Sequence, residues 1–426
     1  MGLRASCKTN AKDKVEFDNS PVNKSERSFN KERRGALSQR VAIVAAVQTK
    51  FVSSQTDLSI GEMIWEVVGK LLEETGLKFE AQGTADKGSL SIDKIISCSE
   101  DYWQGRTISD MLYHMELGAL GMSLTKVAGD GAFAVYHGAV SILSGKYDIA
   151  LVIAYRKESE TVRSVIENAA FDPIYLRPLG IDFLTAAAMQ ANRYIHRCGV
   201  TEEQFAEVVV KNKGNAFQNP SAQEAMKLTV PEVLRSKMLS YPLKELDCKP
   251  VSDGACALIL ASEEKARALT SKPVWITGIG NCYDAHYPGD RDLSDCDSLQ
   301  IAAQKAYAMA GITDPSKEIQ LAEISEEFSY QELLWMEGLG LCERGQAGRL
   351  IQDGITRRDG RLPVNPSGGV LSGNPSGVAG IVRVAEAFLQ LSDRAGERQI
   401  AKAETALAHG VCGPSGQAHC VIILKR

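Results

Sequence analysis

Two parts of the chain repeat the same order of strands and helices and end in similar segments, and this repetition constrains the fold more than any other feature. The first part opens on a buried apolar stretch, "RVAIVAAVQTKF" (40–51), and closes on "VSDGACALILAS" (251–262). The second part opens on "PVWITGIG" (273–280) and closes on "VCGPSGQAHCVIIL" (411–424). A repeat of this kind indicates internal duplication. The alternation of strands with helices predicts an α/β fold, with mostly parallel sheets covered by helices.

The repeat is interrupted once and is preceded by a polar tail. From 159 to 246 the pattern becomes irregular, helical and rich in charge, which predicts a loop domain inserted into the first half. We therefore expect an N-terminal half formed by 40–158 and 247–267, and a C-terminal half formed by 268–426. Residues 1–39 are polar, charged and aperiodic, so we expect a disordered tail. Its acidic residues and its lack of an apolar stretch argue against a secretory signal.

The composition excludes several classes of function. A formal net charge of -5 and a pI near 5.8 argue against nucleic acid or an anionic membrane as the main partner. No apolar run approaches the roughly 20 residues that a membrane helix needs. The 10 cysteines form no CxxC pair, and several lie in apolar strands, which indicates a cytoplasmic protein with reduced core cysteines and no metal site. No P-loop or dinucleotide fingerprint occurs, so we expect no nucleotide cofactor.

One stretch, "LTKVAGDGAFAVYHGAVSILSGKYDIALVIAY" (124–155), has the pattern of a strand, a tight turn, a helix and a second strand. In proteins with this arrangement the turn often carries a nucleophile at the N-terminal end of a buried helix. Here the turn, 127–131, contains neither Cys nor Ser. Asp130 is expected to cap the helix that follows. The usual nucleophile is therefore missing from this turn.

Four motifs, in the right order, resemble those of the thiolase superfamily, in its sterol-carrier-type and archaeal branch. "SDGACALILASEEKA" resembles the family's Asp-Gly-Ala strand and turn, and "NPSGGVLSGNPSGVAG" resembles its Asn-x-x-Gly-Gly and Gly-His-Pro-x-Gly-x-x-Gly block. "EISEEFSYQELLWMEGLGLC" resembles the block that usually reads His-Asp-x-Phe, and "CGPSGQ" resembles Cys-x-Gly-Gly-Gly. The resemblance covers about 40–426. It implies two duplicated βαβαβαββ halves in a five-layered αβαβα arrangement with a helical loop domain, a homodimer, and chemistry on a coenzyme A thioester.

The resemblance places the family's nucleophilic Cys at Ala128, so the usual acyl-enzyme is lost there. Gly129 and Asp130 complete the expected substrate or oxyanion region on this turn. A shift of the alignment by two or three residues supplies no replacement, because no Cys lies between Cys98 and Cys198.

Two further positions depart from the family's pattern. Asn374, which follows Gly373, occupies the position of the His that activates the nucleophile. Its amide remains able to donate a hydrogen bond to an oxyanion. Ser325 occupies the position of the usual His of the third block, and Glu326 and Glu327 are the neighbouring acids, of which one is expected to be solvated or structural. These losses fit one another, because a site without a thiol nucleophile does not need a group to activate it.

The last block retains its reactive residues. The resemblance assigns the acid/base Cys of thiolases to Cys412, which precedes Gly413. His409, three residues earlier, is an alternative proton carrier, because the sterol-carrier-type relatives place a His near this point. The other His residues have no motif and are expected in cores or interfaces. Aromatic residues that either line an acyl pocket or only pack are Tyr102, Trp103, Tyr283 and Tyr287.

Two functions of different classes remain open. The first is an enzyme that makes or cleaves a carbon–carbon bond of a bulky, branched or aromatic acyl-CoA. Retro-aldol cleavage fits the missing thiol best, because it needs only a base and an oxyanion hole, and thiolytic cleavage ranks next. Thiolase-like aldolases act with a small zinc-ribbon/OB-type partner subunit, so the resemblance implies such a partner here. The second is a non-catalytic subunit that binds an acyl-CoA or supports an active partner.

Overall fold

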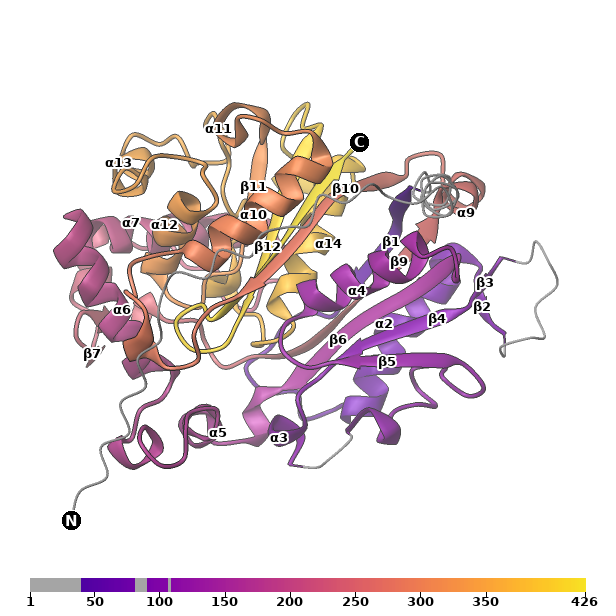
Figure 1. Ribbon diagram of the computed structural model, residues 1–426, viewed down its shortest axis with the longest axis horizontal. Coiled ribbons are helices and arrows are strands. Elements are labelled where there is room, and N and C mark those ends of the chain that lie inside the picture. The colour runs from indigo at the N-terminus through magenta and orange to yellow at the C-terminus, as the bar shows by residue number, and fades with distance from the viewer. Residues whose placement is uncertain (1–39, 81–89, 106–108) are drawn as a thin grey trace, which may run out of the picture. The chain divides into compact units, whose positions relative to one another are not determined.

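The computed structural model describes residues 40–80, 90–105 and 109–426 (Figure 1). The predicted tail, 1–39, lies outside the described residues. One nine-stranded sheet has the order β11-β12-β13-β10-β1-β9-β6-β4-β5. Its strands are β1 Val41–Gln48, β4 Lys94–Cys98, β5 Ser123–Val127, β6 Ile149–Lys157, β9 Asp253–Ser262, β10 Val274–Tyr283, β11 Leu321–Ile324, β12 Thr405–Cys412 and β13 Ala418–Lys425. Two short pairs lie apart from it: β2 (Lys78–Phe79) with β3 (Ser91–Ile92), and β7 (Met238–Ser240) with β8 (Leu243–Lys244).

The strand pairing repeats between the two halves. In the N-terminal half β1 pairs antiparallel with β9, β9 antiparallel with β6, and β6 parallel with β4, which pairs parallel with β5. In the C-terminal half β10 pairs antiparallel with β13, β13 antiparallel with β12, and β12 parallel with β11. A single parallel bridge between Ala322 and Val364 stands where β5 would follow. The duplication expected from the sequence is therefore present in the pairing. The halves join where 41–43 of β1 pair with 274–276 of β10.

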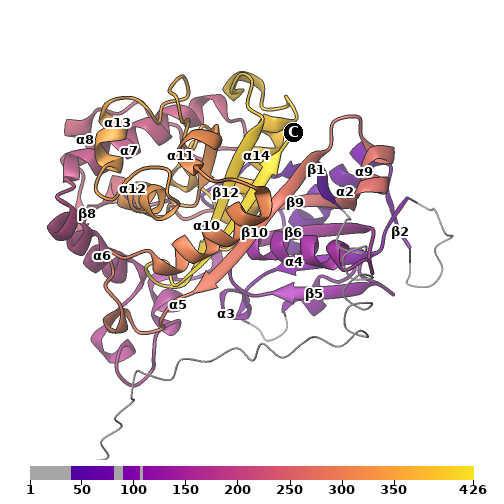
Figure 2. The same ribbon diagram turned by 45° about the horizontal axis from the view of Figure 1, so that its top comes forward.

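The helices form three layers around the strands, as the five-layered arrangement requires (Figures 1 and 2). α4 and α14 contact each other and strands of both halves, so they form the middle layer. α2 and α9 cover the other face of the N-terminal strands, and α10 packs on β10 and β13. The helices are α2 Ile60–Thr75, α3 Asp101–Gln104, α4 Gly131–Leu143, α5 Arg163–Ala169, α6 Phe183–Cys198, α7 Glu202–Asn215, α8 Val230–Leu234, α9 Glu263–Leu269, α10 Asp297–Ala310, α11 Pro315–Glu318, α12 Ser329–Gly338, α13 Ala347–Gln352 and α14 Ala379–Leu391.

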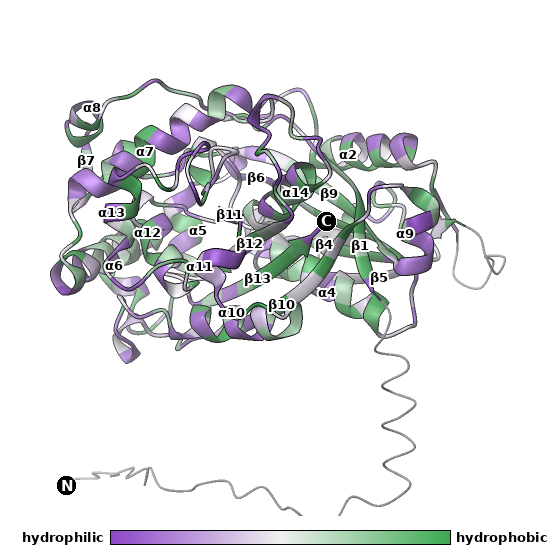
Figure 3. Cartoon of the chain, turned by 90° about the horizontal axis from the view of Figure 1, so that it is seen from above, coloured by the Kyte–Doolittle hydropathy of each residue, from purple (hydrophilic) through white to green (hydrophobic). Residues whose placement is uncertain are grey.

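The middle layer requires small, apolar residues because it packs on two sides. α4 reads "GAFAVYHGAVSIL", and most of its side chains are buried. A Cβ at Gly138 would lie 2.8 Å from side-chain atoms of both Leu260 and Val152, so only glycine allows this close approach of helix and strands. α2, in an outer layer, instead alternates apolar and polar faces, which Figure 3 shows as alternating colours along the helix.

The segment 159–246 carries α5 to α8 and the β7–β8 pair, and none of its residues belongs to the nine-stranded sheet. Its boundaries as a separate loop domain stay a prediction. Among the helices of the described residues, none combines the length and the apolar character that crossing a bilayer requires.

Candidate active site

A cavity of about 270 Å³ lies where segments from both halves and from 159–246 meet. Its walls include Cys412 at the end of β12, Gly129 before α4, and Glu327 after β11. Three of the predicted site residues line the cavity: Gly129, Cys412 and Gly413. Seven do not: Ala128, Asp130, Ser325, Glu326, Gly373, Asn374 and His409.

The resemblance places the missing nucleophile at Ala128, but the residue of this turn that lines the cavity is its neighbour, Gly129. Ala128 is exposed and does not line the cavity. A Cβ built on Gly129 would lie 3.2 Å from Sγ of Cys412, so this is the position whose side chain would face that thiol. Gly129 has φ +116°, a conformation that side-chain-bearing residues rarely adopt. The positive φ of Gly129 turns the backbone here, so that this position faces the cavity and Ala128 stays at the surface. The conclusion that no nucleophile stands here is unchanged.

Cys412 presents a protonated thiol to the cavity. Burial raises the pKa of this thiol, and the nearby charges of Asp130 and Glu100 raise the pKa further. A thiol in this state is a poor nucleophile, since only the thiolate attacks carbonyl carbon. It can still donate its proton to a carbanion that forms beside it.

Asp130 holds the turn to the start of α14. Its Oδ1 accepts a hydrogen bond from the backbone N–H of Ala132 at 2.9 Å, which makes it the cap of α4, as predicted. Its Oδ2 accepts from the N–H of Gly380 at 2.8 Å. Burial raises the pKa of this carboxyl to about 7. Asp130 therefore acts in the structure as a tie between the two helices of the middle layer.

A second thiol, Cys98, stands beside the same turn and was missed by the sequence analysis. Its Sγ lies 3.7 Å from the carbonyl oxygen of Gly129 and 3.6 Å from that of Gly377. Burial raises the pKa of this thiol as well. Cys98 ends β4, and β4 pairs in parallel with β5, so Cys98 stands opposite Val127. The sequence contained a signal for this, because parallel neighbouring strands end at the same edge of a sheet.

Two carboxylates line the cavity with Cys412. Glu100 accepts a hydrogen bond from Arg156, whose guanidinium lies 4.9 Å from the ring centroid of Trp103. Glu327 accepts a hydrogen bond from the hydroxyl of Ser376 at its Oε1. The Arg163 guanidinium lies 3.9 Å from Oε2 of Glu327. The cavity thus combines a protonated thiol with two ionisable acids.

A buried ion pair holds Ser376, the residue that donates a hydrogen bond to Glu327. Nζ of Lys249 lies 2.9 Å from both carboxylate oxygens of Glu158, and both side chains are fully buried. Glu158 also accepts hydrogen bonds from the backbone N–H groups of Ser376 (2.7 Å) and Ser252 (3.1 Å). Burial opposes ionisation of Glu158, but the charge of Lys249, with those of two arginines, brings its pKa below the usual value. The ion pair therefore fixes Ser376, the residue that donates to Glu327.

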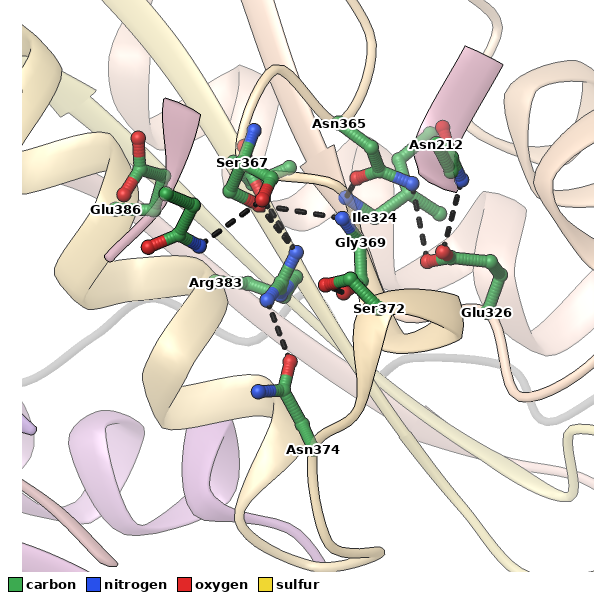
Figure 4. A network of polar contacts seen from close by, with 12 residues as sticks. Asn212, Ile324, Glu326, Asn365, Ser367, Gly369, Ser372, Asn374, Arg383 and Glu386 are labelled. Atoms are coloured by element: carbon green, nitrogen blue, oxygen red, sulfur yellow. Dashed lines mark hydrogen bonds and ion pairs between the residues drawn. The ribbon is translucent and has the colours of Figure 1, made fainter. Parts of the chain in front are cut away.

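Asn374 points into a buried polar network rather than into the cavity (Figure 4). Its Oδ1 accepts from Arg383 at 2.7 Å, and its Nδ2 donates to the carbonyl oxygen of Gly373 at 2.8 Å. Arg383, on α14, also bonds Glu323 (2.6 Å) and Ser367 (2.8 Å). The amide of Asn374 is thus already engaged at both ends, and its role at an oxyanion stays a prediction.

Glu326 and Ser325 are enclosed near the same network. Glu326 accepts hydrogen bonds from the side-chain amides of Asn212 and Asn365, each at 3.0 Å (Figure 4). Burial, and then the charge of Glu332, raises the pKa of Glu326 to about 8. Ser325 is 1% exposed, and its hydroxyl has no hydrogen-bond partner among the described residues. Neither side chain borders the cavity, so their predicted roles at the substrate stay untested.

His409 lies in the core and not at the cavity. Its Nε2 is 2.9 Å from Nδ1 of His419, and both rings pack near Trp335. Burial lowers the pKa of His409 to about 3. Of the two alternatives for the proton carrier, only Cys412 lines the cavity.

Of the four aromatic residues considered for an acyl pocket, two line the cavity and two do not. Tyr102 and Trp103 line the cavity. Tyr283 is 65% exposed, and Tyr287 lines a separate surface groove.

Comparison with known proteins identifies the family. The acetyl-CoA acetyltransferase of Methanothermobacter thermautotrophicus is 35% identical over 382 residues, which are 89% of this chain and 97% of that protein. Residues 281–426 match the family described as thiolase C-terminal domain-like. The chain belongs to the thiolase superfamily.

Two other members are informative. The benzoylsuccinyl-CoA thiolase subunit BbsB of Thauera aromatica is 32% identical over 209 residues, 49% of this chain and 54% of that protein. The structure of the Ltp2-ChsH2(DUF35) aldolase superposes with a TM-score of 0.75 and 24% identity, covering 91% of this chain and 97% of that one. This structural likeness confirms the thiolase fold of the chain.

Proposed function

We propose that this thiolase-superfamily chain cleaves a carbon–carbon bond of a coenzyme A thioester by a retro-aldol reaction, without an acyl-enzyme. The observation that carries the proposal is the pairing of Gly129 with Cys412. The position that faces the cavity thiol has no side chain, and the thiol itself is held protonated. Acid/base chemistry is what such a site supports.

The reaction balances with groups that line the cavity. On a 3-hydroxyacyl-CoA, a carboxylate takes the hydroxyl proton as the C2–C3 bond breaks. The electron pair of that bond moves onto C2 as the thioester enolate, and an aldehyde or ketone leaves. Cys412 then gives its proton to C2, which releases the shortened acyl-CoA. The proton held by the carboxylate finally returns to the Cys412 thiolate.

Glu327 is the carboxylate that we assign to the first step. Its Oε2 lies 3.9 Å from the nearest guanidinium nitrogen of Arg163, whereas Glu100 is directly hydrogen-bonded to Arg156. A carboxylate that is tightly paired with a guanidinium resists protonation, because accepting a proton would give up that ion pair. Glu327 therefore suits the role of base, and Glu100 that of a fixed charge.

A neighbouring pocket of about 620 Å³ suits the coenzyme A arm. Phe328 lines both this pocket and the cavity, so the two adjoin. Three cations and four carboxylates border the pocket, whose other walls are largely apolar: Arg163, Lys213 and Lys249, and Glu167, Asp182, Glu224 and Glu245. An arm with an apolar thiol end and polar amides fits such a lining. No metal or nucleotide cofactor enters this proposal.

The proposed assembly is a homodimer that can recruit a second subunit. β5 is an edge strand of the nine-stranded sheet, and Met111, Leu112, Met115 and Leu120, on the segment before it, are each at least 49% exposed. An edge strand beside exposed apolar residues favours pairing with a second copy. The names of two relatives, a thiolase subunit and an aldolase with a DUF35 partner, support a partner subunit. A small zinc-ribbon/OB-type partner and a cytoplasmic location stay predictions.

A non-catalytic, acyl-CoA-binding subunit is the alternative function. The observation that favours it is that Asn374, Ser325 and Glu326 are enclosed away from the cavity. The retention of a cavity that is lined by a thiol and two acids favours the enzyme.

The test is turnover of 3-hydroxyacyl-CoA and 3-oxoacyl-CoA panels, with the protein alone and with its co-purified partner. Products are identified by mass spectrometry, and the intact protein is weighed for acyl adducts. We expect a carbonyl product and a shortened acyl-CoA from the 3-hydroxy substrates, with no adduct. Cys412→Ala and Glu327→Gln should each lower kcat by about 10²–10⁴-fold, while Cys342→Ala, outside the cavity, should not. An adduct on Cys412 would refute the mechanism, and binding without turnover would favour the alternative.

A further inference from the structure

The turn that follows Cys412, residues 413–417, has an unusual backbone conformation. All five of its residues line the cavity. Gly413, Ser415 and Gly416 have φ values of 77°, 53° and 70°. Positive φ is uncommon for a residue with a side chain, such as Ser415, and it persists only where the surrounding structure imposes it. The groups that hold this turn therefore decide the shape of one wall of the cavity.

Two side chains hold the middle of the turn by its carbonyl oxygens. Nη2 of Arg291 donates hydrogen bonds to the carbonyls of Pro414 and Ser415, at 3.1 Å each. Nε2 of Gln190, on α6, donates to the same Ser415 carbonyl at 2.9 Å. Ser415 is thus fixed by two groups, and the next carbonyl along the turn is that of Gly416.

His419, on β13, holds Gly416. Burial lowers the pKa of His419 well below its usual value, and a hydrogen bond to the Gly416 backbone opposes this shift. A bond that favours the protonated ring is one in which the ring donates, so the Gly416 carbonyl is the acceptor. A Cβ built on Gly416 would lie 2.9 Å from Nε2 of His419, which places this ring nitrogen against the turn.

His409 fixes the tautomer of His419 that makes this bond. Nε2 of His409 lies 2.9 Å from Nδ1 of His419. Because Nε2 of His419 carries the proton that Gly416 accepts, its Nδ1 carries none and accepts a hydrogen bond from His409. Burial lowers the pKa of His409 to about 3, so both rings stay neutral near pH 7 and keep this order of protons.

We propose that His419 is a positioning residue that holds the turn 413–417 in place at the cavity by donating to the Gly416 carbonyl, and that His409 keeps it in the donating tautomer. Neither imidazole lines the cavity, so neither exchanges a proton with the substrate. Their effect on turnover passes through the turn, which begins directly after the Cys412 thiol. The inference rests on the proposed function for the reaction at Cys412, but its first test needs no turnover.

The first test measures how fast iodoacetamide alkylates Cys412, with the modified residue identified by peptide mass spectrometry. His419→Leu removes both ring nitrogens, whereas His419→Gln keeps an amide donor near the position of Nε2. We expect His419→Leu to release the turn, admit water to the thiol and raise the alkylation rate about tenfold. His419→Gln should react at the wild-type rate.

A matched control separates this effect from a general loss of stability. Val421→Ala alters a residue that is also fully buried on β13, but it removes no hydrogen bond to the turn, so its alkylation rate should equal that of wild type. Where His419→Leu does not fold, His409→Leu takes its place. It frees the tautomer of His419 and should raise the rate in the same direction.

The second test measures kcat and KM. A misplaced wall of the cavity should lower kcat in His419→Leu by about 100-fold while KM changes by less than about threefold, and His419→Gln should recover most of the loss. Equal alkylation rates in wild type and His419→Leu, equal effects of the Leu and Gln replacements, or the same increase in Val421→Ala would overturn the inference. An unchanged kcat in His419→Leu would overturn it as well. Faster alkylation in His419→Leu, together with no turnover by wild type, would refute only the proposed function.

Discussion

Replacing Lys249 with Met should destabilise the protein by an amount that depends on pH. The replacement leaves the Glu158 carboxylate fully buried without the ammonium group that contacts both of its oxygens at 2.9 Å. Breaking a buried pair in this way typically costs about 3–5 kcal/mol. Two backbone N–H groups, of Ser376 and Ser252, still bond the carboxylate, so the cost should lie near the lower limit.

Protonation sets an upper bound on this cost. In the variant the Glu158 carboxyl can bind a proton instead of remaining charged. Protonating a carboxyl with an ordinary pKa of 4.5 costs about 1.36 kcal/mol for each pH unit above that value. At pH 7 the bound is therefore about 3.4 kcal/mol. In wild type the pKa of Glu158 is lowered, so the carboxylate contributes stability above pH 4.5 that is lost as the pH falls. In Lys249→Met the folded state prefers the protonated acid, so its deficit should shrink by about 1.4 kcal/mol for each pH unit from 7 to 5.

The assay is urea unfolding of wild type and variant at pH 5, 6 and 7. Lys70→Met on α2 is the control, because Lys70 forms an exposed ion pair with Glu66 and should cost no more than about 1 kcal/mol at any of these values. The double variant Glu158→Gln/Lys249→Met should recover much of the loss and remove its pH dependence. A deficit below about 1 kcal/mol at pH 7, or one that grows toward pH 5, would refute the reasoning.

Three further predictions test the site and the assembly. The stability of Glu326→Gln should rise relative to that of wild type as the pH rises from about 5 to 8. The pKa of Glu326 is raised to about 8, so its proton stabilises the folded wild type below that value and this stabilisation is lost as the pH rises. An equal difference in the free energy of unfolding at both pH values, measured with urea, would contradict this. Gly129→Ala should abolish turnover by placing a methyl 3.2 Å from Sγ of Cys412, whereas Gly76→Ala, also at positive φ but in open space, should retain it. Leu120→Asp should convert the proposed homodimer to a monomer in analytical ultracentrifugation, while Ile301→Asp, on α10, should not. An unchanged sedimentation coefficient for Leu120→Asp would contradict the proposed interface.

The order of elements could be predicted because it depends on local patterns. The segment "PVWITGIG" that opens the second half is β10, Val274–Tyr283, and the strand, helix and strand predicted within 124–155 are β5, α4 and β6. Both follow from the spacing of apolar residues and from the caps, which lie within a few residues of one another. Duplication then supplied the arrangement of the halves, since a repeated sequence pattern repeats its strand pairing.

Two features of the site could not be predicted, because they depend on the direction in which a side chain points and not on its position in the sequence. Counting along the motif reached Ala128, but the backbone torsion of Gly129, φ +116°, decides which residue faces the cavity. Cys98 lies 30 residues before Ala128 in the sequence, and only the register of two parallel strands brings its thiol to the turn. Asn374 faces Arg383 for a similar reason, because α14 carries that guanidinium to it.

The position of His409 could have been predicted from the sequence. His409 and Cys412 both belong to β12, where they are three residues apart. Successive side chains of a strand point to opposite faces, so residues separated by an odd number cannot share one. Once Cys412 is assigned to the cavity, His409 must face the other layer, where it meets His419 and Trp335.

The differences between this site and the thiolase motifs are consistent with one another if the site transfers protons and forms no acyl-enzyme. Removing a side chain at Gly129 leaves the Cys412 thiol beside a backbone rather than beside a second reactive group. With no thiolate to receive an acyl group, no His is needed at position 374, and the Asn there instead fastens its loop to Arg383. The acid that remains, Cys412, shares the cavity with Glu327, which Ser376 and the buried Lys249–Glu158 pair hold in place. A site that keeps its proton donor and a fixed carboxylate but has no nucleophile is suited to breaking a carbon–carbon bond, not to carrying an acyl group.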